Sequence, residues 1–359
     1  MNSQQQRCIH EEKKRRYQQR KKRKKRRLRI LLFLELLIIL CAVLYGLYYY
    51  MFSNVQRTKE PLDVVVNSFQ DENSKNYRLI GLFGVDSQTN ELGKGNRSDA
   101  MIVASINQKT KEVKLLSIYR DTYVNVDRES GSELTKLTHA YAYGGPQLAV
   151  STINQNLDLA ISDYITVNFK ALADTVDLLG GVDLDIQDAE LGNLNAYIGN
   201  MNKINGGNSP KLKHGGLQTL DGNQAVAYCR IRYVGDGDFR RTERQRAVLQ
   251  EIVKKAKHTN PITLTKIVNQ VLPQTLTSLD SLEVLSLAKD IFRYEIVDTQ
   301  GFPFDTYGTK IGGVYYGVPR TLESNVVEGH NYLFDTKGFV PSSTVKEISN
   351  KIINYTGIQ

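Results

Sequence analysis

Short apolar runs separated by polar turns occupy much of the chain after residue 76. The run Tyr77–Val85 is almost continuously apolar and stops at Asp86, a pattern typical of a strand that is buried on both faces. Residues 100–106 and 113–118 repeat this pattern around a polar turn at residues 107–111, which predicts a β-hairpin. Further short strands are predicted at residues 164–169, 182–186, 294–298 and 311–316.

Longer segments with helix-end signals lie between these strands. Pro146, a favoured first helical residue, begins one helix, and Gly180-Gly181 closes another that begins at Lys170. We also expect a loop rich in Asn and Gly at residues 189–216, and helices at residues 221–228, 238–258, 262–271, 279–292 and 343–353. Strands mixed with helices over this length predict an α/β fold, a three-layer α/β/α domain with a mixed central sheet.

A long apolar run precedes this domain. Residues 30–52 are apolar or aromatic except for Glu35 and Gly46, and they are long enough to cross a hydrocarbon core, which needs about 20 helical residues. The run ends in Tyr48-Tyr49-Tyr50-Met51-Phe52, which is typical of an interfacial aromatic belt and not of a signal-peptide cleavage site. We therefore predict one retained transmembrane helix at residues 30–52, a stalk at residues 53–75 and an exterior domain at residues 76–359.

The positive charge of the chain is concentrated in residues 1–29. This tail holds fourteen Lys or Arg and two Glu, a charge of +12, whereas the whole chain has a formal net charge of +9, so the remainder carries 9 − 12 = −3. The positive-inside rule places the basic tail in the cytoplasm, beside anionic lipid head groups, and the domain outside the cell. A mildly acidic domain on the far side of a membrane argues against nucleic acid as a partner.

Six arginines lie between Arg230 and Arg246, around a turn rich in Gly and Asp. If residues 228–233 are extended, Arg230 and Arg232 point to the same side of the strand. Guanidinium groups on the same side of a strand can bind a phosphate through bidentate hydrogen bonds.

The same stretch continues into a predicted helix. Asp238 can cap this helix, whose first turn carries Arg240 and Arg241. Basic residues there oppose the helix dipole, whereas a bound anion is favoured. Two interpretations remain open from these residues alone: an anion-binding site, or a solvated basic face with ion pairs through Glu243.

Charged residues also gather at the predicted strand ends, where α/β sheets bind ligands. Asp86, Arg97, Asp99, Arg120 and Asp121 all lie at such ends. The two carboxylates Asp86 and Asp99 could hold a hard divalent cation together with phosphate oxygens, or the charges could simply pair as salt bridges. No CxxC, HExxH or GxSxG motif is present to support another chemistry.

Several short motifs occur in a fixed order over residues 76–257. They are GVDS at residues 84–87, RSD at 97–99, SIYRDT at 117–122, KLTHAYAYGG at 136–145, LGGV at 179–182, LDG at 220–222, YCRIR at 228–232 and DFRRTERQ at 238–245. This set resembles the LytR-CpsA-Psr family of surface phosphotransferases in Gram-positive bacteria. Tyr119, Thr138 and Cys229 depart from the residues usual in the family, but none of these departures removes a charged group.

The resemblance implies a phosphotransferase that moves an anionic glycopolymer, teichoic acid or capsular polysaccharide, from a polyprenyl-pyrophosphate carrier to peptidoglycan and releases polyprenyl phosphate. It implies that Asp86 and Asp99 hold Mg²⁺, with Mn²⁺ as the alternative ion. It also implies an apolar tunnel for the lipid between sheet and helices. The implied pyrophosphate ligands are Arg97, Arg120, Lys136, Arg230, Arg232, Arg241 and Gln245, and the implied catalytic residues are Arg120, Asp121 and Asp238, with the two aspartates orienting the arginines.

Three other functions compete with this one. A polyprenyl-phosphate binding module without turnover would keep the arginines but tolerate loss of Asp86 and Asp99. A lipid pyrophosphatase would release polyprenyl phosphate without an acceptor. A transcription regulator, suggested by the basic tail, would require the tail or the domain to meet DNA, but the predicted span separates the domain from the cytoplasm and the domain has a negative net charge. We therefore predict a single-pass, membrane-anchored transferase whose partners are a lipid-linked glycan, peptidoglycan and membrane lipids, and not nucleic acid.

Overall fold

The computed structural model describes residues 41, 46, 56–57, 63–87, 91–235 and 237–359. The chain divides into a short unit, Met1–Asn54, and a compact unit, Val55–Gln359. The predicted cytoplasmic tail and, apart from Cys41 and Gly46, the predicted span fall outside the described residues. No helix in the described ranges is both long and apolar enough to cross a membrane.

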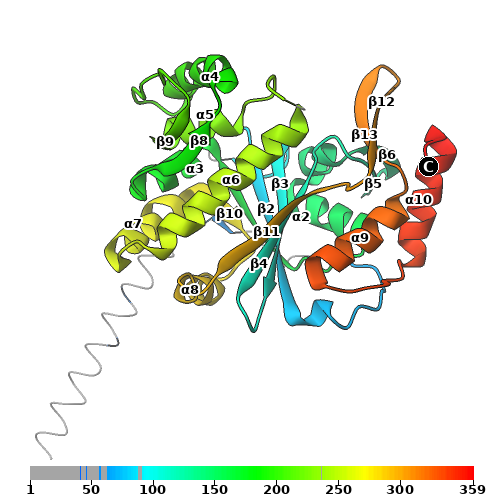
Figure 1. Ribbon diagram of the computed structural model, residues 1–359. Coiled ribbons are helices and arrows are strands. Elements are labelled where there is room, and N and C mark those ends of the chain that lie inside the picture. The colour runs from blue at the N-terminus through cyan, green and yellow to red at the C-terminus, as the bar shows by residue number, and fades with distance from the viewer. Residues whose placement is uncertain (1–40, 42–45, 47–55, 58–62, 88–90, 236) are drawn as a thin grey trace, which may run out of the picture. The chain divides into compact units, whose positions relative to one another are not determined.

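A mixed sheet forms the centre of the compact unit (Figure 1). β2 is parallel to β7 and antiparallel to β3, and β3 with β4 forms the predicted hairpin. The carboxyl ends of β2, β4 and β7 therefore meet at one edge of the sheet, together with the start of β3. The strand order is β1 (Gln56–Arg57), β10 (Thr275–Thr277), β7 (Asp163–Asn168), β2 (Tyr77–Val85), β3 (Ser98–Asn107), β4 (Glu112–Ile118) and β11 (Glu295–Phe302).

One face of the sheet is covered by α2 (Leu137–Leu157) and α9 (Leu322–Phe334), and α10 (Ser343–Thr356) packs against both helices (Figure 1). Side chains alternate along a strand, so every second residue of β3 points to this face. Met101 and Val103 are buried here in the main hydrophobic core, together with residues of α2 and α9.

The opposite face is covered by α3 (Phe169–Leu178), α5 (Gly222–Cys229), α6 (Asp238–Lys257) and α7 (Pro261–Val271). The intervening β3 residues Ile102 and Ala104 pack on this side with Leu249 of α6. This arrangement confirms the predicted mixed α/β class. The layer is extended by β8 (Val182–Ile186), α4 (Leu191–Ile204), β9 (Gly216–Leu220) and α8 (Ser281–Lys289).

Two predicted segments are wrong because tertiary packing overrides local sequence preference. Residues 189–216, expected to be a loop, contain α4. Leu194, Ile198 and Met201 recur on one side of this helix and are fully buried, which compensates for the poor helix propensity of its Asn and Gly residues. Residues 228–233 are not extended, since α5 continues through Cys229 and Arg230 keeps helical backbone angles at its end.

Two helix starts also differ from the prediction. α2 begins at Leu137, well before Pro146; Gly145, with φ 67° and ψ −157°, interrupts the helix, and Pro146 begins its second part. α6 is preceded by Gly237 at the cap position, and Asp238 is its first helical residue and makes no side-chain cap. The carboxylate of Asp238 is engaged by arginines instead.

Two hairpins were not predicted. They are β5 (Tyr123–Arg128) with β6 (Gly131–Lys136), and β12 (Thr306–Ile311) with β13 (Val314–Pro319). The single strand predicted at residues 311–316 in fact spans a turn at Gly312-Gly313, where both glycines have positive φ. Single 3-10 turns occur at Ser74–Asn76, Asp188–Glu190 and Leu272–Gln274.

Residues 63–75, part of the predicted stalk, belong to the compact unit and pack against its other residues. The ring of Phe69 packs edge-on against His330 and Phe339. Asp71 is buried, and its carboxylate lies 2.7 Å from Nδ1 of His330 and accepts a hydrogen bond from Thr336 at 2.8 Å. These contacts fix this segment to the domain.

Candidate functional site

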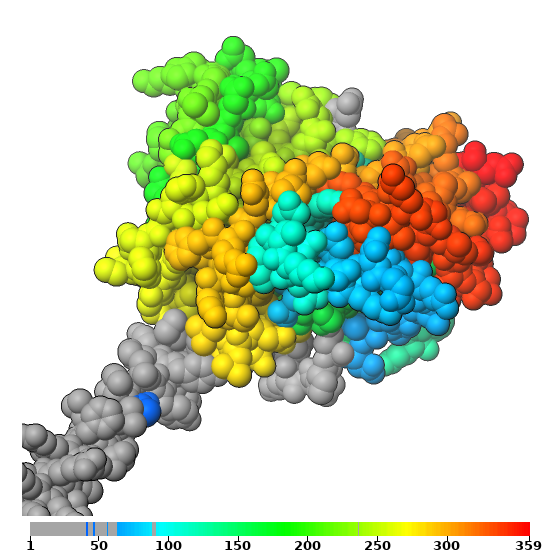
Figure 2. All heavy atoms as spheres, turned by 60° about the horizontal axis from the view of Figure 1, so that its bottom comes forward, coloured from blue at the N-terminus to red at the C-terminus, as the bar shows by residue number. Residues whose placement is uncertain are grey.

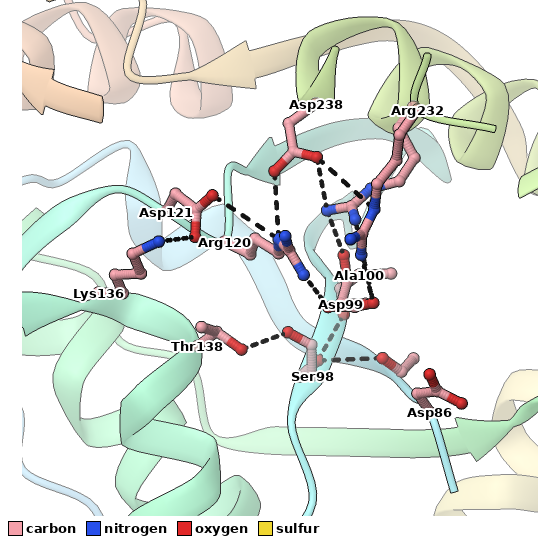
Figure 3. Close-up of polar contacts among 12 residues, drawn as sticks. Asp86, Ser98, Asp99, Ala100, Arg120, Asp121, Lys136, Thr138, Arg232 and Asp238 are labelled. Atoms are coloured by element: carbon pink, nitrogen blue, oxygen red, sulfur yellow. Dashed lines mark hydrogen bonds and ion pairs between the residues drawn. The ribbon is translucent and has the colours of Figure 1, made fainter. Parts of the chain in front are cut away.

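The charged cluster lies at the edge of the sheet where β2, β4 and β7 end and β3 begins (Figure 3). Asp86 directly follows β2, Asp99 is the second residue of β3, and Arg120 with Asp121 follows β4. The first turn of α6 and the loop before it supply the remaining members, Arg232, Asp238 and Arg241. Segments that are far apart in the sequence thus meet at one sheet edge, as the strand-end pattern predicted.

Asp99 lies at the centre of the cluster, between Arg120 and Arg232 (Figure 3). One carboxylate oxygen is 2.7 Å from Arg120, and the other is 2.8 Å from Arg232 and 3.9 Å from Arg241. Burial raises the pKa of Asp99, but the three arginines outweigh this effect and hold the pKa below its ordinary value. Asp99 is therefore a carboxylate at neutral pH that fixes three guanidinium groups.

Asp238 binds the same arginines from the other side. Nε of Arg120 donates to it at 3.2 Å, while Arg241 and Arg232 lie 3.4 Å and 4.0 Å from it. Asp121 is 2.9 Å from the ammonium group of Lys136 and 3.8 Å from Arg120. Asp121 and Asp238 both contact cations of the cluster, and this position fits the orienting role that the resemblance implied.

Arg241 is the most deeply buried cation of the cluster, with 2% of its side chain exposed. Burial lowers the pKa of Arg241 to about 10, against the opposing effects of Asp238 and Asp99. Its NH2 group donates to the backbone carbonyl of Asp99 at 3.2 Å, but Nε finds no hydrogen-bond partner among the described residues. An unpartnered buried donor costs about 1–3 kcal/mol. An anion at this site would supply the partner.

Arg230 lies apart from the Asp99 group. Its guanidinium stacks over the rings of Phe169 and Tyr197, at 4.6 Å and 5.4 Å from their centroids, and donates to Asn200 at 2.8 Å. It is also 3.9 Å from Asp86. We did not predict Tyr197 and Asn200 as part of the site because they belong to α4, which was taken for a loop. The spacing of buried apolar residues in α4 is the signal that could have placed them.

The predicted ligands do not all converge. Arg97 is exposed, and within the described ranges no hydrogen bond or ion pair joins it to the cluster. Gln245 faces the same cavity as the arginines, but its amide donates only a long hydrogen bond, at 3.5 Å, to the carbonyl of Cys229. Lys136 reaches the site through Asp121.

Two further arginines of the stretch at residues 230–246, Arg240 and Arg244, pair with carboxylates outside the cluster. Arg240 forms a surface ion pair with Glu243 at 2.7 Å. Arg244 is buried, pairs with Glu190 at 2.7 Å and donates to the carbonyl groups of Ile231 and Val234, which fixes the loop before α6. The predicted ion pair through Glu243 therefore applies to Arg240, and anion binding stays a prediction for the arginines that line the cavity.

An apolar cavity of about 550 Å³ opens from the cluster into the layer between sheet and helices. Along β2, Leu82 lies four residues before Asp86, about 13 Å away at 3.3 Å per residue, so the cavity extends well beyond its charged end. The charged lining is Asp86, Asp99, Arg230, Arg232 and Arg241, and the polar lining includes Asn168, Thr175, Gln245 and Thr275. The apolar lining includes Leu82, Ile102, Ile165 and Val167 from the sheet and Leu172, Val226, Val248, Leu249, Ile252 and Val271 from the helices.

Asp86 and Asp99 both line the mouth of this cavity. In the described part of the chain, no three His, Cys, Asp or Glu residues converge to form a metal site made of protein alone. Mg²⁺ is commonly held by one or two carboxylates, phosphate oxygens and waters, and this donor set fits that arrangement. Asp86 is the more available ligand, because its side chain is 44% exposed whereas arginines occupy both oxygens of Asp99.

The chain is similar to several known proteins in sequence and in fold. The teichoic acid transferase TagU of Enterococcus faecalis is 31% identical over 218 residues, 60% of this chain and 66% of that protein. TagU of Bacillus licheniformis is 32% identical over 240 residues, 66% of this chain and 70% of that protein. A solved structure of YwtF (TagT) with bound octaprenyl pyrophosphate lipid is similar with a TM-score of 0.52 and 25% identity, over 85% of this chain and 100% of that one.

The match to the family as a whole covers more of the chain than either of the two TagU similarities. The sequence profile of the LytR_cpsA_psr family covers residues 45–330, and this range includes the charged residues of the sheet edge and the arginines at residues 230–246. The chain therefore belongs to the LytR_cpsA_psr family.

Proposed function

We propose that this protein transfers an anionic glycopolymer from a polyprenyl-pyrophosphate carrier to peptidoglycan and releases polyprenyl phosphate. The observation that carries the proposal is the junction of an arginine-rich cluster with a long apolar cavity at Arg230, Arg232 and Arg241. A lipid-linked pyrophosphate has the same two parts, an anionic group joined to a long apolar chain. The TagU relatives, named polyisoprenyl-teichoic acid–peptidoglycan teichoic acid transferases, and the structure with octaprenyl pyrophosphate support the proposal.

The arginines would bind the pyrophosphate in positions that are set before it arrives. Asp99 and Asp238 hold Arg120, Arg232 and Arg241 from two sides, so little reorganisation is needed when an anion enters. Phosphoryl transfer depends mainly on positioning and on neutralising developing charge, and both are supplied by fixed guanidinium groups. The apolar cavity would hold the first part of the lipid and exclude water from that side of the reacting phosphate.

We assign Mg²⁺, or Mn²⁺ in its place, to Asp86 and Asp99. The cluster itself is nearly neutral, since its five cations and four carboxylates give 5 − 4 = +1, which leaves little excess charge for an anionic ligand. When bound, the ion would neutralise part of the charge on the pyrophosphate oxygens. The residues counted are Arg120, Lys136, Arg230, Arg232 and Arg241 against Asp86, Asp99, Asp121 and Asp238.

We place the catalytic domain outside the cell, on a single-pass anchor at residues 30–52 with the basic tail in the cytoplasm. The apolar length of the anchor and its basic flank support this orientation. Outside the cell, the lipid carrier and peptidoglycan meet, and the carrier already contains the energy-rich pyrophosphate bond. Because the carrier brings this bond, the reaction needs no ATP, and the sequence contains no P-loop motif.

The test is a turnover assay with the full-length protein in lipid nanodiscs. The assay supplies a synthetic polyprenyl-pyrophosphate glycan, Mg²⁺ and peptidoglycan fragments, and follows the release of polyprenyl phosphate. We expect release to require both acceptor and divalent ion, and to fall about 10²–10³-fold in Arg120→Ala, as when one preorganised donor is lost. Asp86→Ala should lose the response to Mg²⁺. Arg320→Ala is the control, because Arg320 pairs with Asp305 and not with the cluster.

The competing functions give different results in the same assay. Release of polyprenyl phosphate that does not depend on acceptor would show a lipid pyrophosphatase. Tight lipid binding without release, in a preparation whose melting temperature is normal, would show a binding module. Either result would reject the transferase.

A further inference from the structure

Four apolar side chains are exposed on and beside α7 and α8, which lie next to each other at one side of the compact unit (Figures 1 and 2). They are Ile262, Leu282, Leu285 and Phe292, and we call this surface the α7–α8 face. Ile262 is 72% exposed, Leu282 69% and Phe292 50%. Single exposed apolar residues are common, but several on two neighbouring helices can mark an interaction surface.

The α8 helix is apolar on two opposite sides. Val284 and Leu287 point inward, where they line a hollow of about 200 Å³ together with Val268 and Leu272. Leu282 and Leu285 lie on the outer side. A helix that is apolar on both sides is expected where both sides are covered. The inner side is covered by the protein, and the outer side is free to contact an apolar partner.

The path of the chain indicates what this partner is. Gln56 of β1 pairs with Leu276 of β10, and its side-chain amide donates to the carbonyl of Pro273 at 3.2 Å. Four residue steps separate Gln56 from Phe52, the last residue of the predicted span, and these steps reach at most about 14 Å. The strand β10 therefore lies close to the bilayer surface if residues 30–52 cross it, and β10 leads directly into α8.

Charge near the face favours apolar contact over electrostatic attraction. Residues 261–293 contain three basic and three acidic side chains, so their net charge is 3 − 3 = 0. Two of the three acids are engaged in ion pairs, Glu283 with Arg78 and Asp290 with Lys111. A helix with an outward apolar stripe and no charge excess suits shallow insertion among lipid chains, with little dependence on anionic head groups.

We propose that the α7–α8 face is a membrane-docking surface, by which the domain rests on the outer leaflet of the bilayer. The inner hollow under α8 shares the lining residues Ile165, Val271 and Thr275 with the main cavity. The docked face thus lies over an apolar route to the site. That this route admits the tail of the lipid substrate rests on the proposed transfer reaction, whereas docking rests on the proposed membrane span alone.

The chain contains no tryptophan, so one introduced tryptophan reports its own surroundings without background. We would place Leu282→Trp and, as the matched control, Tyr355→Trp in otherwise unchanged full-length protein in liposomes that contain brominated phosphatidylcholine. Tyr355 is 66% exposed on α10, a helix of the opposite layer. We expect blue-shifted emission and strong quenching by bromine for Leu282→Trp, and neither for Tyr355→Trp. Equal emission and equal quenching in the two variants would overturn the proposal.

A second measurement separates docking from a contact between protein copies and from the route of the lipid. If Leu282→Trp is shifted to the blue but not quenched, and the protein sediments as a dimer, the face binds a second copy and the docking proposal is wrong. In the turnover assay, Leu282→Asp should lower turnover of a donor embedded in the bilayer severalfold, and leave a short-chain donor in solution unaffected. Val340→Asp, at a position 69% exposed elsewhere, is the control. Quenching without this difference in turnover would keep docking and reject the lipid route, and inactivity towards both donors would point to the proposed function instead.

Discussion

Arg240 and Arg241 are neighbours in sequence but have opposite environments. Arg241 is buried against Asp99 and Asp238, whereas Arg240 is exposed and pairs with Glu243. We expect Arg241→Ala to lower kcat about 10²–10³-fold, because loss of one preorganised donor costs about 2.7–4 kcal/mol of transition-state stabilisation. Arg240→Ala should leave kcat nearly unchanged, because the ion pair of Arg240 with Glu243 lies on the surface. Its loss should also cost little stability, since an exposed ion pair contributes only about 0.2–1 kcal/mol. Steady-state kinetics of the two purified variants check this difference.

Arg241→Ala also removes one of the cations around Asp99, so its folding must be measured by urea unfolding in parallel. Arg241→Lys should recover part of the activity at most, because an ammonium group lacks the planar fork that reaches Asp99 and Asp238 together. Equal kcat in Arg241→Ala and Arg240→Ala, both folded, would show that burial does not mark the functional arginine.

The same residues show how far sequence reasoning reaches at this scale. The residues of the cluster could be named from the charged residues at strand ends and from the short motifs, because both can be read directly along the sequence. Which arginine is buried did not follow, since Arg240, Arg241 and Arg244 occupy one helix and differ only in the elements packed around them. The stacking of Arg230 over Phe169 and Tyr197 could not be predicted for the same reason.

At the scale of elements, glycine allows α5 to approach α3 closely. A Cβ at Gly222 would lie 2.3 Å from the carbonyl oxygen of Ala173, whereas a Cβ at Gly199 in α4 would meet nothing within 4 Å. We expect Gly222→Ala to destabilise the protein by about 1–3 kcal/mol through overpacking. Gly199→Ala should stabilise it by about 0.5–1 kcal/mol, because alanine loses less backbone entropy in a helix. Urea unfolding of both variants measures the two free energies.

The essential result is that Gly222→Ala and Gly199→Ala change the free energy of unfolding in opposite directions. If Gly222→Ala kept full stability, the backbones of α3 and α5 would have to separate easily, and Arg230 at the end of α5 would not be held rigidly at the site. A loss of stability in Gly199→Ala would indicate that the outer side of α4 is covered by another surface.

Elements with a strong periodic signal could be predicted, and elements stabilised by distant partners could not. The strands β2, β3 and β4 are apolar enough to be recognised from the sequence alone. The α4 helix is rich in Asn and Gly, and it forms because Leu194, Ile198 and Met201 fill a core built by other segments. The turn at Gly312-Gly313 was missed because the apolar residues on both sides of it read as one strand.

The cavity exists only at the scale of the whole molecule, because strands and helices from Leu82 to Thr275 contribute to its lining. The tunnel was predicted from the family resemblance, and no local pattern in the sequence indicated its position or its volume of about 550 Å³. Its two ends have different chemistry: arginines at the sheet edge, and apolar side chains towards α7. Binding of the pyrophosphate and binding of the lipid chain should therefore be separable by substitution.

Leu249 of α6 lines the cavity opposite Ile102 and tests this separation. Leu249→Trp would fill part of the cavity while leaving the arginines untouched. We expect the Kd for a long-chain polyprenyl pyrophosphate to rise severalfold and the Kd for a short-chain pyrophosphate to stay the same, both measured by calorimetry. Stability should not fall, because the larger side chain buries more apolar surface, at about 25 cal/mol per Å². Equal weakening for both chain lengths, or none for either, would mean that the lipid does not occupy this cavity.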